Sequence, residues 1–157
     1  MPVGTVNWIE EGMLGSTIRA VSSPGPETAS EIPGFEFGLT NQFFHGLHPL
    51  GWIRSLRVYL DGVEIPANAL TLVIRDQPIP VTLVPRVSDI YWQPLETVTI
   101  RVEGEQPPAT GAHVLTCSLA VSTFIFTPEI DRADLYPATE LRLTREVSLV
   151  GDARIGA

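Results

Sequence analysis

The sequence predicts an all-β fold, since several short strands at the spacing found here indicate an antiparallel sandwich or barrel. Of the two we expect an antiparallel β-sandwich, which forms a single domain over residues 1–157. Apolar residues recur at every second position in several short segments, which is the periodicity of a strand with one buried face. Fourteen prolines and thirteen glycines are spread along the chain and fall mostly between or at the edges of these segments. Almost no segment has the spacing of an amphipathic helix. With 44% hydrophobic residues, the chain can bury one substantial core.

The expected strands follow one another along the chain, each with its apolar residues on one face. The first lies in residues 34–40, where Phe35, Phe37 and Leu39 alternate with polar residues and glycine. Asp61-Gly62 separates two later strands as a two-residue hairpin turn, because both positions favour positive φ. The inward positions of the other strands are Leu56, Val58 and Leu60; Leu70, Leu72 and Ile74; Val98, Ile100 and Val102; Leu115, Cys117, Leu119, Val121 and Ile125; and Leu141, Leu143, Val147 and Leu149.

Two longer segments lack this alternation and are expected to be loops within the domain. Residues 22–33 (SSPGPETASEIP) have the composition of a flexible loop. Residues 127–140 form an acidic loop that carries Glu129, Asp131, Asp134 and Glu140. Their spacing lacks the glycine and the terminal glutamate of an EF-hand, so a solvated loop is expected rather than a calcium site.

Composition and charge exclude several classes of partner and compartment. The net charge of −8 disfavours binding to nucleic acid or to an anionic membrane surface. The N-terminal residues have neither the basic nor the apolar region of a secretory signal. No apolar run approaches the ~18 residues of a membrane span. A lone cysteine, Cys117, excludes an internal disulfide and fits a reducing compartment. We therefore expect a cytoplasmic protein.

The sequence does not predict a self-contained catalytic or metal site. It contains no G-x-S-x-G nucleophile motif. His45 and His48 lie three residues apart in a loop, and His113 begins a distant strand, so no third metal ligand is expected nearby. Cys117 lies on an apolar strand face, where it serves as a small buried residue.

Aromatic and imidazole side chains are concentrated in one segment, GFEFGLTNQFFHGLHPLGW, residues 34–52. After the strand, it brings together Phe43, Phe44, His45, His48 and Trp52. These side chains offer rigid apolar surfaces and two imidazoles that can donate or accept hydrogen bonds at neutral pH. Such a loop suits an interface core or the lid of an aromatic-binding pocket. Alternatively, the rings close one end of the sandwich and His48-Pro49 turns the chain.

Residues 34–126 resemble the small (beta) subunit of bacterial C-glycoside deglycosidases in the order and spacing of their motifs. The signature of that family is a G-F-x-F-G strand, an aromatic pair, a basic residue, glycine and leucine. Two departures affect hydrogen bonding: the aromatic pair, usually tyrosine, is phenylalanine here, and a histidine stands where arginine is expected. The departing residues are Phe43 and Phe44, which occupy the aromatic pair, and His45, which stands at the position of the basic residue. The signature is matched at Gly34, Phe35, Phe37, Gly38, Gly46 and Leu47.

The resemblance implies a β-sandwich subunit that works beside a larger, TIM-barrel-like subunit carrying a divalent metal, with manganese the expected ion. Such pairs cleave the carbon–carbon bond between a sugar and an aromatic aglycone, after the C3 hydroxyl of the sugar has been oxidised to a ketone. The small subunit then binds no cofactor and carries no catalytic residue. Its substrate-proximal or interface residues are expected to be Phe43, Phe44, His45, Gly46, His48 and Trp52.

Two other classes of function remain open. A stand-alone carbohydrate- or ligand-binding sandwich would use Trp8, Trp52 and Trp92 as a sugar-stacking platform. A structural domain that assembles with itself would use an edge strand together with Phe124 and Phe126. Binding of a sugar by the isolated chain favours the first class, and a stable homo-oligomer without ligand or partner favours the second.

Overall fold

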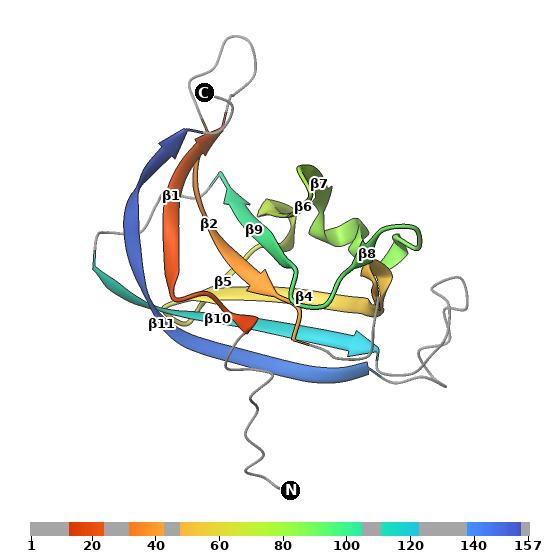
Figure 1. Cartoon of the computed structure of the whole chain (residues 1–157). Coiled ribbons are helices and arrows are strands. Elements are labelled where there is room, and N and C mark those ends of the chain that lie inside the picture. Colours follow the sequence, from red (N-terminus) through yellow and green to blue (C-terminus); the bar gives the residue numbers. More distant parts are fainter. Residues whose placement is uncertain (1–12, 24–31, 43–47, 105–110, 123–137, 155–157) are drawn as a thin grey trace, which may run out of the picture.

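The computed structural model describes residues 13–23, 32–42, 48–104, 111–122 and 138–154 as strands, turns and short 3-10 helices (Figure 1). The strands are β1 (Thr17–Ser23), β2 (Ile32–Thr40), β3 (His48–Pro49), β4 (Ile53–Leu60), β5 (Val63–Ile65), β6 (Leu70–Ile74), β7 (Gln77–Pro80), β8 (Tyr91–Trp92), β9 (Thr97–Glu103), β10 (Ala112–Ser122) and β11 (Ala138–Arg154). The 3-10 helices are η1 (Leu50–Trp52), η2 (Ala67–Ala69) and η3 (Val81–Arg86). The predicted all-β class is confirmed.

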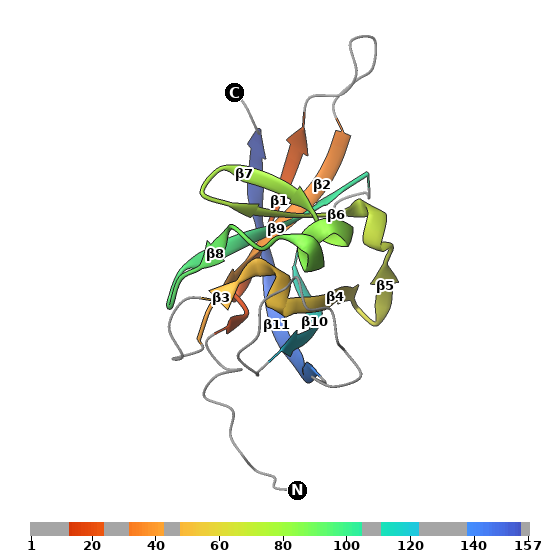
Figure 2. The ribbon, with the colours of Figure 1, turned by 90° about the vertical axis from the view of Figure 1, so that its right-hand side faces the viewer.

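Nine of the strands in the described part of the chain form one continuous sheet, in the order β5-β4-β10-β11-β1-β2-β9-β6-β7. The sheet curls into a half-barrel, so the half that contains β4 and β10 faces the half that contains β2 and β9 (Figures 1 and 2). The described strands therefore form a curled half-barrel, which is not clearly the expected two-sheet antiparallel sandwich. β11 is the physical reason, because it pairs with β10 over its first part and with β1 over its last part.

The pairing of β1 with β11 is parallel, whereas every other neighbouring pair in this sheet is antiparallel among the described strands. The two strands meet through the register Thr17–Ser148 to Ser22–Arg154, with an irregularity between Arg19 and Ala20. A long strand that bends between two partners lets one sheet enclose a core without breaking into two layers.

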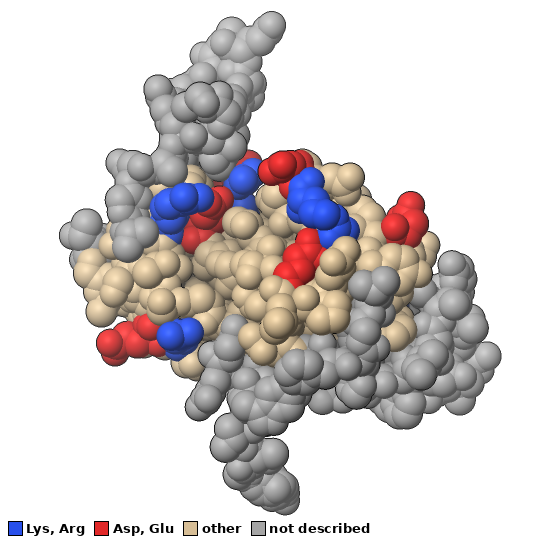
Figure 3. All heavy atoms as spheres, viewed as in Figure 1, with Lys and Arg blue, Asp and Glu red and all other residues tan. Residues whose placement is uncertain are grey.

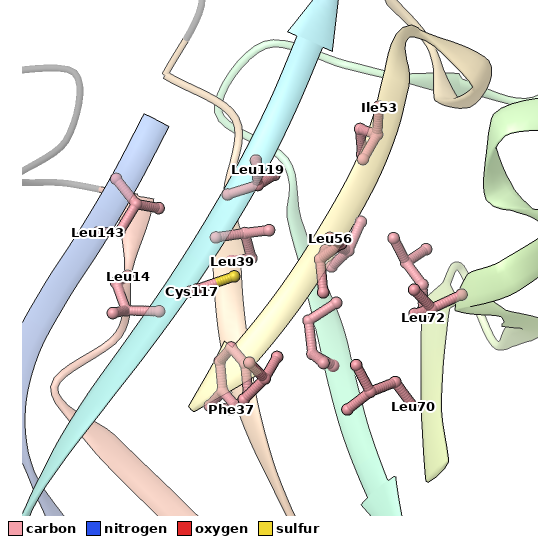
Figure 4. Packing of buried hydrophobic residues seen from close by; sticks show 14 of the residues in the cluster. Leu14, Phe37, Leu39, Ile53, Leu56, Leu70, Leu72, Cys117, Leu119 and Leu143 are labelled. Atoms are coloured by element: carbon pink, nitrogen blue, oxygen red, sulfur yellow. The ribbon is translucent and has the colours of Figure 1, made fainter. Parts of the chain in front are cut away.

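The core fills the inside of the curl and confirms the predicted strand faces. Leu56 of β4 and Cys117 and Leu119 of β10 lie close to Phe37 and Leu39 of β2 (Figure 4). Strict alternation of buried and less buried residues runs through β6 and β9, as the sequence predicts. Other buried members of the core are Leu70, Leu72, Ile74, Val98, Ile100, Val102, Leu115, Val121, Leu143 and Val147.

Two tight turns connect neighbouring strands through residues with positive φ. Asp61 and Gly62, at φ 50° and 84°, form the predicted hairpin turn between β4 and β5. Arg75 and Asp76, at φ 46° and 65°, form a second two-residue turn between β6 and β7 that contains no glycine. β7 contains Pro78 and Pro80, and it can do so because it lies at the edge of the sheet.

The two expected loops are shorter than predicted. β1 extends to Ser23 and β2 begins at Ile32, with Ser23 paired to Ile32, so the ends of segment 22–33 are strand and residues 24–31 lie outside the described residues. β11 begins at Ala138, which places Glu140 in a strand. The other predicted positions of this region, Phe124, Ile125, Phe126, Glu129, Asp131 and Asp134, lie outside the described residues, as does Trp8.

Within these same ranges, no helix combines the length and the apolar character that crossing a membrane requires.

Candidate functional site

We call residues 41–52 the aromatic segment, and the structure describes its two flanks on either side of residues 43–47. Phe43, Phe44, His45 and Gly46 lie outside the described residues. The backbone of His48 begins β3, and Trp52 ends η1 with a partly buried side chain. The candidate site is therefore built from the residues that precede and follow residues 43–47.

The glycines of the G-F-x-F-G strand are explained by close packing around β2. Phe35 and Phe37 are buried in the core. A Cβ atom on Gly34 would lie 2.0 Å from the carbonyl oxygen of Val102 on β9, so only glycine allows this approach. A Cβ on Gly38 would meet the methyl group of Thr97 at 3.0 Å, a tight contact with a side chain rather than with backbone. The signature thus fixes how β2 packs beside β9 before the aromatic segment begins.

Asn41 fixes the start of the segment and is completely buried. Its side-chain Nδ2 donates to the carbonyl oxygens of Trp92 and Gln93, at 3.1 Å each. Its backbone N–H donates to the carbonyl of Glu96 at 2.9 Å, and its own carbonyl accepts from the N–H of Leu95 at 2.8 Å. Because so many bonds converge on one buried side chain, the chain leaves β2 along a fixed path. No pattern in the sequence distinguishes Asn41 from an ordinary polar loop residue.

The flank that follows residues 43–47 pairs with the stretch of chain around Trp92, to which Asn41 also bonds. His48 and Pro49 pair with Trp92 and Tyr91 in the two-stranded sheet β3–β8. The N–H groups of Leu50 and Gly51 then donate to the carbonyls of Ile90 and Val87, at 2.9 and 2.8 Å. Both flanks of residues 43–47 are therefore held by residues 87–96, which we call the support segment.

The guanidinium of Arg54 links the C-terminal flank of the aromatic segment to the end of η3. Its Nη1 donates to the carbonyl oxygen of Gly51 at 2.7 Å and to that of Pro85 at 3.1 Å. Because Gly51 also binds Val87, η1 and the end of η3 are joined beside β4.

The two aromatic residues of the support segment point in opposite directions, as expected for neighbours on a strand. Trp92 is 2% exposed, and its Nε1 donates to the carbonyl of Glu96 at 2.8 Å. Tyr91 is 41% exposed. A solvent-open sugar platform that includes Trp92 is therefore not formed, since its indole ring is in the core.

Arg75, in the β6–β7 turn, ties that hairpin to the support segment. Its Nη1 lies 2.5 Å from Oε2 of Glu96, and its Nη2 donates to the carbonyl of Tyr91 at 3.0 Å. The other carboxylate oxygen of Glu96 accepts from the N–H of Gln93 at 2.9 Å. The support segment is thus held by hydrogen bonds from two residues: Asn41 at the end of β2, and Arg75 in the β6–β7 hairpin.

A second polar cluster lies on the outer face of β1, β2 and β9. Glu36 is only 7% exposed and forms ion pairs with Arg19 and Arg101, the latter at 3.5 Å between Nε and Oε2. Figure 3 shows acidic and basic side chains beside one another over these strands. Thr17, Gly38 and Thr99 line a depression of about 300 Å³ next to them. Two guanidinium groups explain how a carboxylate is tolerated at this burial.

The other titratable residues considered as possible catalytic groups or metal ligands, His113 and Cys117, make contacts within the fold. The Nδ1 atom of His113 lies 2.7 Å from Oδ2 of Asp61, and Oδ1 of Asp61 accepts from the N–H of Val114 at 2.8 Å. The bond from Val114 and then the bond with His113 lower the pKa of Asp61. Burial raises the pKa of Cys117 to about 12. Over the described ranges, no three His, Cys, Asp or Glu side chains gather as a metal site requires.

The comparison with protein families finds a match over most of the described strands. A family model described as C-glycoside deglycosidase beta subunit matches residues 16–123, which run from the start of β1 to the end of β10 and include both flanks of residues 43–47 and the support segment. No curated protein matches the chain significantly. Because the family model covers more than half of the chain, the chain belongs to the C-glycoside deglycosidase beta subunit family.

Proposed function

We propose that this chain is the small subunit of a cytoplasmic hetero-oligomeric enzyme that cleaves the carbon–carbon glycosidic bond of 3-oxo-C-glycosides, such as aryl C-glucosides of flavonoid or anthraquinone type. Its family supports a role as one subunit of a C-glycoside deglycosidase. We expect the larger partner to be a TIM-barrel-like subunit that carries the catalytic groups and a divalent metal, manganese being the expected ion. The isolated small subunit is then inactive.

The chemistry differs from that of ordinary glycosidases because the aglycone is attached through carbon and offers no leaving oxygen to protonate. A ketone at C3 acidifies the C2 proton, so a base on the large subunit can remove it. The resulting enolate electrons form the C1–C2 double bond and expel the aglycone. The electron pair of the broken C1–aryl bond stays on the ring carbon, which takes up a proton. A divalent metal supplies stabilisation of the enolate charge.

The small subunit contributes a wall to the pocket and excludes water from it. We assign this role to residues of the aromatic segment: Phe43, Phe44, His45, Gly46, His48 and Trp52. The observation that carries the assignment is that both flanks of residues 43–47 are bonded to the support segment, from Asn41 on one side and from β3 and η1 on the other. A loop that forms part of a binding pocket must be held in a fixed position, and the bonds at both flanks meet this requirement.

The phenylalanine pair gives this pocket wall an apolar character, which suits the face of a flat aromatic aglycone. His45, standing where the family has arginine, is the expected donor to a phenol or phenolate of that aglycone. Replacing His45 with alanine in the reconstituted complex tests this role. Unchanged turnover on every 3-oxo-C-glycoside tried would exclude it.

Purification of the tagged chain from its host, followed by native mass spectrometry, tests the proposed assembly. We expect a larger partner with a bound divalent metal, and release of the aglycone from a 3-oxo-C-glycoside by the complex. Recovery of the chain alone and able to bind a sugar would instead indicate a ligand-binding protein. Recovery only as a homo-oligomer would indicate a structural role.

A further inference from the structure

Leu95 occupies a turn position that its side chain disfavours. Residues Gln93 to Glu96 form a type II turn, closed by the N–H of Glu96 donating to the carbonyl of Gln93 at 3.0 Å, with Pro94 at the second position. Leu95 is at the third position with φ 65°. That position favours glycine or asparagine, because a Cβ atom crowds the backbone at positive φ.

Burial does not compensate for this conformation, since Leu95 is 63% exposed. The chain therefore retains a bulky apolar residue where glycine would relieve the backbone and where the folded subunit gains little from the side chain. Residues in disfavoured backbone conformations cluster at functional sites, which directs attention to what this side chain contacts in the complex.

Val63 provides a contrast within the same chain. It is 67% exposed but begins strand β5, where a β-branched residue suits the backbone. A single exposed apolar side chain of this kind needs no further explanation. Exposure alone does not distinguish Leu95; the combination of exposure with a disfavoured backbone does.

Hydrogen bonds and an ion pair hold the turn that presents Leu95. Leu95 itself donates its N–H to the carbonyl of Asn41 at 2.8 Å. The carboxylate of Glu96 binds the N–H of Gln93 and the guanidinium of Arg75, so both ends of the turn are held. Binding through such a preorganised turn loses little conformational entropy.

Further exposed side chains lie within a few residues of Leu95 in the sequence. Tyr91 is 41% exposed and Pro94 is exposed in the same short segment. The Arg75–Glu96 pair beside them is partly exposed, with side-chain exposures of 47% and 19%. A binding interface needs a central aromatic or aliphatic anchor and a polar rim, and this short stretch offers residues of both kinds. We call Tyr91, Pro94 and Leu95 the Leu95 patch.

We propose that the Leu95 patch docks into an apolar recess of the larger deglycosidase subunit and thereby sets the position of the aromatic segment in the complex. The inference rests on the proposed function. The large subunit is the favoured occupant because the chain belongs to a family of beta subunits and because Leu95 bonds directly to Asn41, the residue that begins the aromatic segment.

Three variants test the docking, each measured for its dissociation constant with the purified large subunit and for the thermal stability of the isolated chain. Leu95→Asn keeps a residue that tolerates positive φ but removes the apolar side chain. Leu95→Met keeps an apolar side chain of similar size. Val63→Thr is the matched control, because Figure 2 shows β5 and β8 on opposite sides of the molecule.

We expect Leu95→Asn to weaken binding by about tenfold or more, as loss of a hot-spot residue does, without lowering the thermal stability of the isolated chain. Leu95→Met and Val63→Thr should bind within about threefold of the unmodified chain, since neither loses an apolar anchor at the interface.

Three results would overturn the docking site. If the unmodified chain binds the large subunit and Leu95→Asn binds equally well, the contact lies elsewhere and the proposed function still stands. If Leu95→Asn unfolds the isolated chain, Leu95 serves the fold. If the unmodified chain is a dimer that Leu95→Asn dissociates, the occupant is a second copy. Failure of the unmodified chain to bind the large subunit at all would contradict the proposed function itself.

Discussion

The side-chain Nδ2 of Asn41 lies 3.1 Å from the carbonyl oxygen of Trp92, and both side chains are buried to at least 98% of their surface. This pair joins the end of β2 to β8, two elements that are about fifty residues apart in the sequence. It also fixes the point at which the aromatic segment begins, and its energetic contribution can be measured.

Replacement of Asn41 by alanine should destabilise the isolated chain by about 2–3 kcal/mol, because the carbonyls of Trp92 and Gln93 lose their donor and a buried space is left. Asn41→Asp should cost more, since it places a carboxylate against two carbonyl oxygens. Urea unfolding monitored by Trp fluorescence measures both changes. The exposed Gln93 side chain offers the control, and Gln93→Ala should stay within about 0.5 kcal/mol. Equal stability of all three variants would contradict the anchoring role.

Two glycine replacements should show how much stability is lost through steric crowding and how much through an unfavourable backbone conformation. Gly34→Ala places a methyl group on the carbonyl of Val102, so we expect a loss of about 3 kcal/mol or a failure to fold. Gly62→Ala meets no atom within 4 Å but has φ 84°, so its expected cost is only about 1 kcal/mol. Differential scanning calorimetry distinguishes the two. A mild effect of Gly34→Ala would show that β2 and β9 do not approach as described.

Asp61 should make the stability of the chain depend on acidity. In the folded chain the pKa of Asp61 lies below its ordinary value of 3.8. Ionised Asp61 therefore stabilises the fold at pH values above 3.8, and this contribution disappears as the pH falls through the lowered pKa. Asp61→Asn retains a residue that tolerates positive φ but removes the charge. We expect the variant to be less stable than the unmodified chain at neutral pH and the difference to shrink as the pH falls below 3.8. A difference that grows on acidification would have the wrong sign.

Cys117 should be inert towards thiol reagents in the folded chain. It has no exposed surface and a pKa raised to about 12 by burial, so almost no accessible thiolate exists at pH 8. Alkylation by iodoacetamide should follow global unfolding and become fast in urea. Rapid labelling of the folded chain at pH 8, measured by mass spectrometry, would show that β10 opens locally.

The strand faces were predictable because each is encoded by alternation within a few residues, as in Leu70, Leu72 and Ile74. The hairpin at Asp61-Gly62 was predictable for the same reason, since the turn chemistry is local. β1 was missed because the irregularity after Arg19 breaks its alternation and buries both Ala20 and Val21. Its parallel pairing with β11 joins residues about 130 positions apart, and no local pattern indicates such a partner.

The candidate site was predictable in part. The glycines and aromatic residues of the signature indicated where it lies, although residues 43–46 fall outside the described residues. Asn41 could not be distinguished from a polar loop residue, because its role depends on carbonyls supplied by Trp92 and Gln93. Leu95 was missed because a leucine after Pro94 does not suggest a turn that usually requires glycine. The only sequence signal was the proline itself.

Titration of the chain into a fixed amount of the large subunit, with aglycone release from a 3-oxo-C-glycoside as the readout, tests the central claim most directly. We predict no turnover by the isolated chain and a rise in rate that saturates at a fixed stoichiometry. Full activity of the large subunit without this chain, or no change in rate on adding it, would contradict the assignment as a deglycosidase subunit.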